Sequence, residues 1–216
     1  MEEFDIRGER IRIRPDRSLY WPAKRVLVVA DMHFGKTEAF RADSVPVPGG
    51  TEATLLLLDI ALRETAAERL VVLGDFWHSK AGRSERVLGE LARWRASRAG
   101  LSIDLVRGNH DRAGAPPDGW GSDWETRTLL DPPFCFTHFP HPSADGYVLA
   151  GHLHPGTVLR GLGRERLRLP CFWFGPTVGV LPAFGTFTGL SEIAPAAGDR
   201  VFVIGDGCIF ELPPDT

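Results

Sequence analysis

The sequence has little of several features that mark specialised protein classes. It contains 3 cysteines in 216 residues. This odd number, with no pair at zinc-knuckle spacing, indicates a chain from a reducing compartment. No stretch approaches the ~20 apolar residues of a membrane span, and the opening MEEFDIRGER lacks the apolar core of a signal peptide. There is no repeat and no low-complexity tract. We therefore expect a complete, cytoplasmic protein.

Basic charge is not in excess either. The chain carries 25 Lys+Arg against 28 Asp+Glu, a formal net charge of −3. This balance excludes a globally basic coat for nucleic acid or membranes, so a local patch or bound cations must attract any phosphodiester. A hydrophobic content of 43% at this length predicts a single domain over residues 1–216 with a sizeable core.

The two halves of the chain differ in their hydrophobic pattern. In the first half, apolar runs at 25–31, 69–75 and 102–107 each end at a polar motif, and helical periodicity covers 55–64 and 84–99. An edge strand is expected at 11–15, and Thr51 is expected to cap the first helix. From about residue 125, short strand patterns follow one another at 126–130, 134–138, 147–152, 157–160, 171–174, 178–181, 200–204 and 208–212. We expect an α/β fold with two sheets packed face to face, the second mostly antiparallel, and helices outside.

Histidine is the informative residue type, because all 7 histidines lie in or beside short polar motifs. Most of these motifs follow a predicted strand: Asp31-Met32-His33, Gly74-Asp75, Gly108-Asn109-His110-Asp111, His138, and Gly151-His152-Leu153-His154. In an extended strand, residues i and i+2 share a face, so D-x-H and H-x-H would each present two ligands to one site. Each motif alone is compatible with a turn or a structural histidine, but their ordered combination is not expected by chance.

The donor set is chemically coherent. Asp31, His33, Asp75, Asn109, His138, His152 and His154 offer oxygen and nitrogen but no thiolate. Such ligands suit Mn²⁺ best here, with Fe and Zn²⁺ as alternatives. With one bridging carboxylate, seven donors can hold two ions, the arrangement used for phosphoester hydrolysis. His110 can serve as a general acid, and Asp111 can fix its orientation.

These motifs resemble the pattern of the calcineurin-like metallophosphoesterases, which fold as a four-layer αββα sandwich. The resemblance implies that Asp31, His33, Asp75 and His154 hold one metal, and that Asp75, Asn109, His138 and His152 hold the other. It also implies that His110 is the catalytic acid and Asp111 its orienting partner. The segments LYWPAKRVLVVADMHFGKTEAFRADSVPVPGGT, GHLHP and LPAFGTFTG are similar to a bacterial subgroup of ligase-associated DNA-damage-response endonucleases, or phosphodiesterases. That similarity implies a role in DNA repair beside a DNA ligase and a helicase.

One departure from the superfamily bears on the substrate. Many of its phosphoprotein phosphatases read G-D-x-x-D-R at the second motif, whereas this chain has Gly74-Asp75-Phe76-Trp77-His78. The missing Arg favours a phosphodiester over a phosphomonoester. The alternatives are a nucleotide or nucleoside-diphosphate-lipid pyrophosphatase and a non-catalytic scaffold.

Residues near the motifs supply candidates for substrate contact. Those for polar contact are Lys36, Arg41, His78 and His141. Those for stacking a base or sugar are Phe34, Trp77, Trp120 and Trp124. For all of these, a surface, second-layer or core role is an open alternative.

Overall fold

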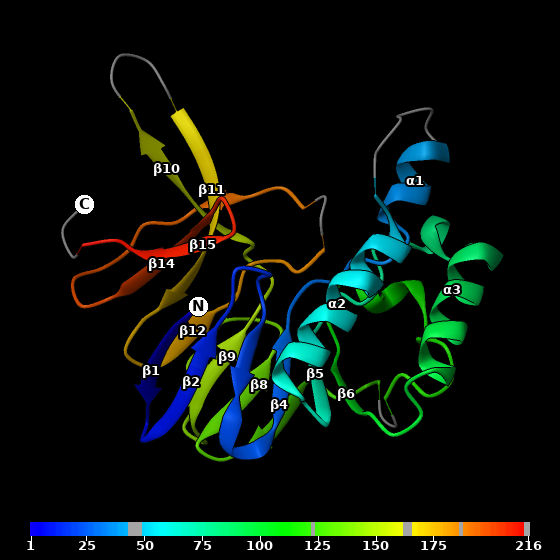
Figure 1. The fold of residues 1–216 in the computed structure, drawn as a ribbon, viewed down its shortest axis with the longest axis horizontal. Helices are drawn as coiled ribbons and strands as arrows, with labels where there is room; N and C mark the ends of the chain where they lie inside the picture. Colours follow the sequence, from blue (N-terminus) through cyan, green and yellow to red (C-terminus); the bar gives the residue numbers. More distant parts are fainter. Residues whose placement is uncertain (43–48, 122–123, 162–165, 186–187, 214–216) are drawn as a thin grey trace.

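Two mixed β-sheets pack against each other in the computed structural model, which describes residues 1–42, 49–121, 124–161, 166–185 and 188–213 (Figure 1). The helices are α1 (Lys36–Ala42), α2 (Thr51–Thr65) and α3 (Glu85–Ala96), with short 3₁₀ turns η1 (Pro22–Lys24), η2 (Lys80–Gly82) and η3 (His110–Ala113). The first sheet contains β1 (Glu2–Ile6), β2 (Glu9–Ile13), β3 (Leu19–Trp21), β4 (Val26–Val29), β5 (Arg69–Leu73) and β6 (Ser102–Val106). The second contains β7 (Thr128–Asp131), β8 (Phe134–Thr137), β9 (Tyr147–Ala150), β10 (Pro155–Arg160), β11 (Arg166–Phe174), β12 (Val178–Val180), β13 (Ser191–Glu192), β14 (Arg200–Gly205) and β15 (Cys208–Glu211).

The first sheet is ordered β1-β2-β3-β4-β5-β6, antiparallel up to β4 and parallel from β4 to β6. Its central strands are buried on both faces, which explains their continuous apolar runs. Val26 and Val28 point into the core between the sheets, whereas Leu27 and Val29 pack against the helices. Thr51 is the first residue of α2 and follows an N-cap at Gly50, one residue earlier than expected.

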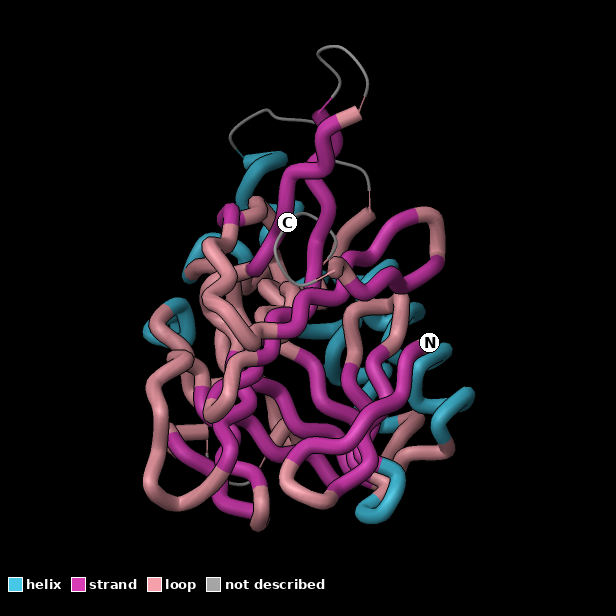
Figure 2. Tube along the Cα trace, turned by 90° about the vertical axis from the view of Figure 1, so that its left-hand side faces the viewer, coloured by secondary structure: helices cyan, strands magenta, loops and turns pink. Residues whose placement is uncertain are grey.

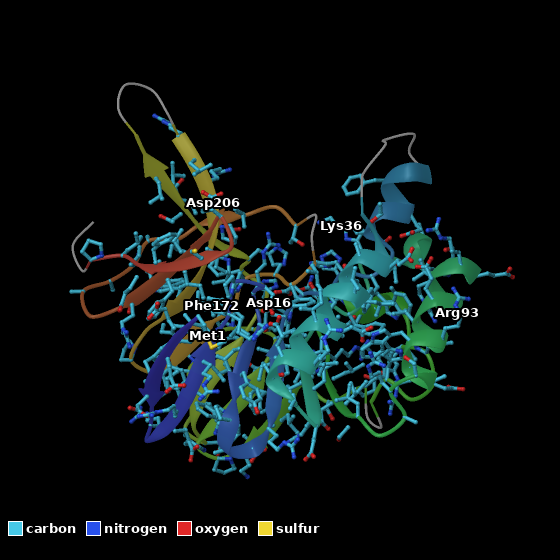
Figure 3. The ribbon with its side chains drawn as sticks, viewed as in Figure 1. Met1, Asp16, Lys36, Arg93, Phe172 and Asp206 are labelled. Atoms are coloured by element: carbon cyan, nitrogen blue, oxygen red, sulfur yellow. The ribbon has the colours of Figure 1, made fainter. Side chains whose placement is uncertain are left out.

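The second sheet is mostly antiparallel, as predicted, but β9 pairs in parallel with both β8 and β12. Phe134, Phe136 and Phe172 turn inward from it and join the core shared with the first sheet. Figure 3 shows Phe172 among the strands and Arg93 on the outer side of α3, away from the second sheet. Strands from both halves of the sequence thus bury one common apolar layer.

The two mixed sheets with helices outside confirm the predicted α/β sandwich, but the helices are distributed unevenly. All three α-helices of the described residues lie on the side of the first sheet (Figure 1). On the far side of the second sheet, Ile193 and Leu212 pack over Cys171 instead. A helical layer does not form there because the sequence after residue 125 has strand patterns without helical periodicity. None of the described helices has the length and apolar character needed to cross a bilayer.

One end of the sandwich collects the motifs. The carboxyl ends of parallel strands β4, β5 and β6 meet at the same edge, and the loops after β8 and β9 reach this edge as well. The hairpin of β10 and β11 and helix α1 project toward the same end of the molecule (Figures 1 and 2). Five separate chain segments therefore deliver polar side chains to one region.

Candidate metal centre

Backbone hydrogen bonds hold the first two motifs side by side. The N–H of Asp31 donates to the carbonyl of Gly74 at 3.2 Å, and that of His33 donates to the carbonyl of Asp75 at 2.9 Å. The third motif joins through the N–H of His110, which lies 2.9 Å from Oδ1 of Asp75. Each motif is thus positioned by its neighbour as well as by its own strand.

The last two motifs close the same region. The N–H of His152 donates to Oδ2 of Asp31 at 2.9 Å, and the N–H of Gly151 donates to the carbonyl of His138 at 3.2 Å. Nδ1 of His138 lies 2.9 Å from the carbonyl oxygen of Leu73, at the end of β5. The five motifs therefore form one hydrogen-bonded network rather than five independent loops.

The way paired ligands come together differs from the prediction. Strands β4 and β9 end at Val29 and Ala150, so neither D-x-H nor H-x-H lies in an extended strand. Instead, Asp31, His33, His152 and His154 have φ angles of 52°, 48°, 71° and 48°, and Asp75 has 49°. This left-handed backbone is uncommon outside glycine, although Asp and His adopt it more readily than most residues. Left-handed turns beyond the strands, not strand pleating, therefore direct these candidate ligands toward one another.

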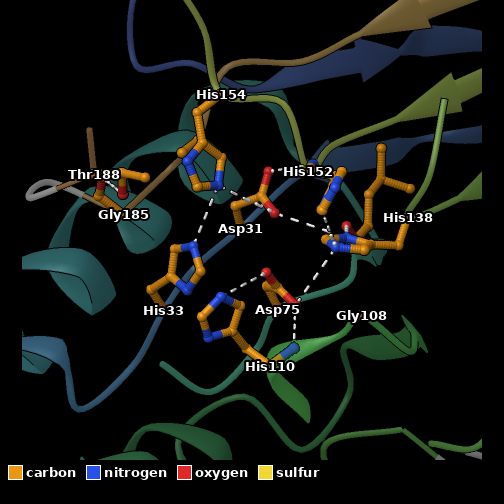
Figure 4. Close-up of polar contacts among 12 residues, drawn as sticks. Asp31, His33, Asp75, Gly108, His110, His138, His152, His154, Gly185 and Thr188 are labelled. Atoms are coloured by element: carbon orange, nitrogen blue, oxygen red, sulfur yellow. Dashed lines mark hydrogen bonds and ion pairs between the residues drawn. The ribbon is translucent and has the colours of Figure 1, made fainter. Parts of the chain in front are cut away.

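Beside a group of three histidines (His33, His78 and His110), two clusters of candidate ligand atoms that include a carboxylate lie in this region (Figure 4). Asp31, His33 and His154 form one, and Asp75, His138 and His152 form the other, with the ligand atoms of each within 4.8 Å of one another. Nε2 of His33 lies 3.3 Å from Nε2 of His154. The structure thus brings together all seven side chains singled out from the sequence, with Asn109 joining the second cluster.

His138 shows why a cation fits the second cluster. Its Nδ1 donates to the carbonyl of Leu73, which leaves a lone pair on Nε2. That Nε2 lies 3.0 Å from Oδ1 of Asn109, 3.1 Å from Nδ1 of His152 and 3.5 Å from Oδ1 of Asp75. Because the His138 side chain is buried, water does not screen this convergence of oxygen and nitrogen donors, and a cation would stabilise it.

The first cluster shows the same signature. Asp31 is fully buried, and its Oδ1 accepts no hydrogen bond, while Nε2 of His154 lies 3.6 Å away. Burial, reinforced by the nearby His154, lowers the pKa of His33 to about 2. His33 is therefore neutral at physiological pH, the state in which an imidazole binds metal. An unpartnered buried carboxylate oxygen beside two imidazole nitrogens matches a metal ligand set.

Two motif glycines make room for ligands of other motifs. A Cβ on Gly74 would lie 2.3 Å from Nδ1 of His138, and a Cβ on Gly108 would lie 2.2 Å from Oδ1 of Asp75. Any larger residue at either position would displace the side chain of His138 or Asp75. The glycines in G-D and G-N-H-D are thus part of the site's geometry rather than simple turn residues.

The side chain of His110 lies at the edge of the clusters, with Nε2 3.9 Å from Oδ2 of Asp75. Its orientation differs from the expectation, because Nδ1 lies 2.7 Å from the backbone carbonyl of His78 rather than against Asp111. The carboxylate of Asp111 instead accepts the N–H groups of Trp77 and Gly108, at 3.1 Å and 2.8 Å. Asp111 therefore stabilises the loop that carries His110 and does not orient the ring directly.

Three of the four residues proposed to contact substrate lie near the clusters, and they differ in burial. Lys36 is half-buried beside His33, and burial lowers its pKa. His78 lies 5.6 Å from His33 between ring centroids, and burial lowers its pKa to about 4. His141 is exposed and follows His138 along the rim. Arg41 belongs to α1, but its side chain lies outside the described residues.

The aromatic residues chosen from the sequence are mostly core. Phe34, Trp77 and Trp120 are buried, and Trp124 is half-buried with Arg107 over its ring. The stacking role predicted for the three buried rings is therefore wrong, because they fill the core between the helices and the first sheet. Two other rings are exposed beside the clusters, Phe40 and Phe139. Their signal in the sequence is position alone, since one follows D-x-H closely and the other follows His138.

Taken together, the sandwich and its paired oxygen–nitrogen clusters define a metal-dependent phosphoester hydrolase. The family model for calcineurin-like phosphoesterases matches residues 24–170, and the chain belongs to this family, which uses a dinuclear divalent metal centre. A Pseudomonas putida protein solved as nuclease MPE is 41% identical, with a TM-score of 0.86 and coverage of 98% of this chain and 99% of that one.

A more distant solved structure is Yfce, a phosphoesterase from E. coli. It is 15% identical and has a TM-score of 0.42, with 87% of this chain and 97% of that chain covered. Comparison with curated proteins gives no match.

Proposed function

We propose that the protein is a DNA phosphodiesterase, acting as an endonuclease in DNA repair with two divalent cations, Mn²⁺ first among them. The observation that carries the proposal is the pair of ligand clusters with the His110 imidazole fixed at their edge. The similarity to the P. putida nuclease over nearly the whole length of both chains supports a nucleic-acid substrate. Association with a DNA ligase and a helicase stays a prediction.

We assign the ligands as the motif pattern implies. Asp31, His33 and His154 would hold one cation, and Asn109, His138 and His152 the other, with Asp75 shared between them. When bound, two such cations would lower the pKa of a water molecule and neutralise charge on the phosphoryl oxygens. The side chains supply the complementary requirement, because burial lowers the pKa of His33 and keeps that ring neutral, and backbone N–H groups hold the carboxylates of Asp31 and Asp75 in place.

His110 would supply the proton for the leaving oxygen. The hydrogen bond to the carbonyl of His78 places the proton of a neutral ring on Nδ1. A second proton, on Nε2, then faces the clusters, where it can pass to an alkoxide that leaves phosphorus. Lys36, His78, His141 and Arg41 are proposed to contact the substrate around the rim.

The test is a panel of substrates incubated with the metal-free protein and Mn²⁺. The panel contains plasmid, single-stranded DNA, cyclic nucleotides, a nucleoside-diphosphate ester and bis-p-nitrophenyl phosphate. We expect Mn²⁺-dependent cleavage of DNA and of the nitrophenyl diester. Cleavage of only the small esters would contradict the endonuclease proposal, and preferred cleavage of the diphosphate ester would support the pyrophosphatase alternative. Metal analysis of the purified protein, expected to give two ions per chain, checks the assigned centre independently.

A further inference from the structure

Two phenylalanines on opposite sides of the metal centre are exposed to solvent. Phe40 on α1 is 37% exposed, and Phe139 after β8 is 36% exposed. Phe40 lies on the side of His110, whereas Phe139 lies on the side of His138 and His152. Large apolar rings at such a rim point to a ligand with apolar faces.

The ring of Phe40 is the outermost of three nearly parallel rings. It stacks on His78 with centroids 6.1 Å apart and planes 22° apart. His78 stacks in turn on His110 at 5.7 Å and 16°. The stack therefore leads from the proposed acid outward to an exposed aromatic face, with His78 supporting that face from below.

The ring of Phe139 also packs against other rings of the site. Its centroid lies 4.9 Å from that of His138 and 4.6 Å from that of His152. Its backbone carbonyl accepts hydrogen bonds from Oγ1 of Thr137 at 2.8 Å and from the N–H of His141 at 2.9 Å. The ring is thus fixed directly beside two metal ligands, although it is not itself buried.

We propose that Phe40 and Phe139 are stacking platforms for the two nucleobases that flank the scissile phosphodiester. The inference rests on the proposed nuclease function. Every base offers a planar π-face, so such platforms bind nucleotides without reading their sequence. One exposed ring on each side of a centre built for one phosphoryl group matches a substrate with one planar group on each side of its phosphate. A continuous lipid chain would instead require an uninterrupted apolar surface, whereas the polar rings of His78 and His110 follow Phe40 toward the metal centre.

The placement also assigns sides to the substrate. Since His110 protonates the leaving oxygen, the nucleoside that departs lies against the stack that ends in Phe40. The nucleoside that keeps the phosphate then lies over Phe139. Bases held in this way are unstacked from each other, so each platform acts on one base alone.

The experiment combines ring removal with base removal. The probe is a single-stranded oligonucleotide with one phosphodiester among methylphosphonate linkages, prepared also with an abasic sugar on either side of that phosphodiester. We expect Phe40→Ala to lower kcat/KM about tenfold on the complete probe, the size of one base–aromatic contact. On the probe that lacks the leaving-side base, Phe40→Ala should match the unmodified protein. Phe139→Ala should show the same dependence on the other base, and Phe40→Trp should retain activity on the complete probe.

The matched control is Phe210→Ala, which removes a 57% exposed ring from β15. This variant should cleave every probe with the kcat/KM of the unmodified protein. If ring removal and base removal lower kcat/KM independently, so that the losses multiply, the rings merely support their histidines and the inference is overturned. An unmodified protein that cleaves bis-p-nitrophenyl phosphate but none of the DNA probes contradicts the proposed function instead. Metal content equal to that of the unmodified protein verifies that each variant retains its centre.

Discussion

Removing the imidazole of His110 tests the proposed chemistry most directly. The ring is 40% exposed and makes no hydrogen bond to a clustered side chain: Nε2 approaches Oδ2 of Asp75 only to 3.9 Å, and the ring meets that of His33 edge-on with centroids 5.2 Å apart. His110→Ala should therefore leave metal content close to two ions per chain. What the substitution removes is the proton on Nε2, the ring nitrogen that does not face the carbonyl of His78.

The expected loss depends on the leaving group. General acid catalysis is typically worth ~10²–10⁴-fold, or about 3–5 kcal/mol of transition-state free energy. A sugar alkoxide is a strong base and needs the proton, so DNA cleavage should fall by this factor. A nitrophenolate is a weak base that leaves without a proton, so hydrolysis of bis-p-nitrophenyl phosphate should stay near its original rate.

The assay compares kcat/KM for both substrates in the His110→Ala variant, alongside metal analysis. Equal losses on the two substrates would refute the acid role and place His110 in binding or in metal retention. An unchanged rate of DNA cleavage would refute it as well.

Four further predictions concern the centre and its frame. Asp75→Ala should lose both bound metal and activity, and a variant that still holds two ions would contradict the shared carboxylate. Gly108→Ala places a Cβ 2.4 Å from the backbone nitrogen of Asp75, so it should destabilise the protein by about 1–3 kcal/mol and weaken metal affinity; Gly100→Ala, with nothing within 4 Å, is the control. The lowered pKa of His33 means that the unfolded chain takes up a proton below pH 6.5 while the folded chain does not. Metal-free protein should therefore lose about 2 kcal/mol at pH 5 relative to pH 7 through this residue, and His33→Asn should abolish that loss in urea unfolding. We also propose one domain, and calorimetry should show a single transition with equal calorimetric and van't Hoff enthalpies.

The sequence was sufficient to predict which side chains come together, because the ends of the strands can be recognised in its hydrophobic pattern. The apolar runs before Asp31, Asp75 and Asn109 predict parallel strands, and parallel strands bring their carboxyl ends together. The pattern could not show the backbone angles at the ligands, since left-handed turns depend on hydrogen bonds between motifs such as that from His152 to Asp31. Spacing alone therefore paired Asp31 with His33 correctly but for the wrong geometric reason, and it paired His152 with His154, which lie in different clusters.

Contacts between segments that are distant in the chain could not be predicted from the sequence pattern. Asp111 follows His110 directly, which made an orienting contact plausible, but its two oxygens satisfy buried N–H groups of Trp77 and Gly108 instead. The exposed rings of Phe40 and Phe139 were missed for a related reason. Burial is decided by the folded surroundings, and large aromatic residues near motifs, such as Trp77, are more often core.

The left-handed backbone at five proposed ligands has a consequence for selection and engineering. Such a residue costs up to about 1–2 kcal/mol when it is not glycine, less for Asp and His, which adopt this backbone more readily, so the five together amount to a sizeable part of the net stability of an ordinary domain. Metal binding favours the folded state and offsets this strain. A screen for heat resistance without a requirement for activity would therefore enrich glycine or asparagine at positions such as Asp31 and His154. The resulting proteins would be more stable to heat but inactive. The strained residues therefore mark positions that are maintained only by selection for the activity of the metal centre.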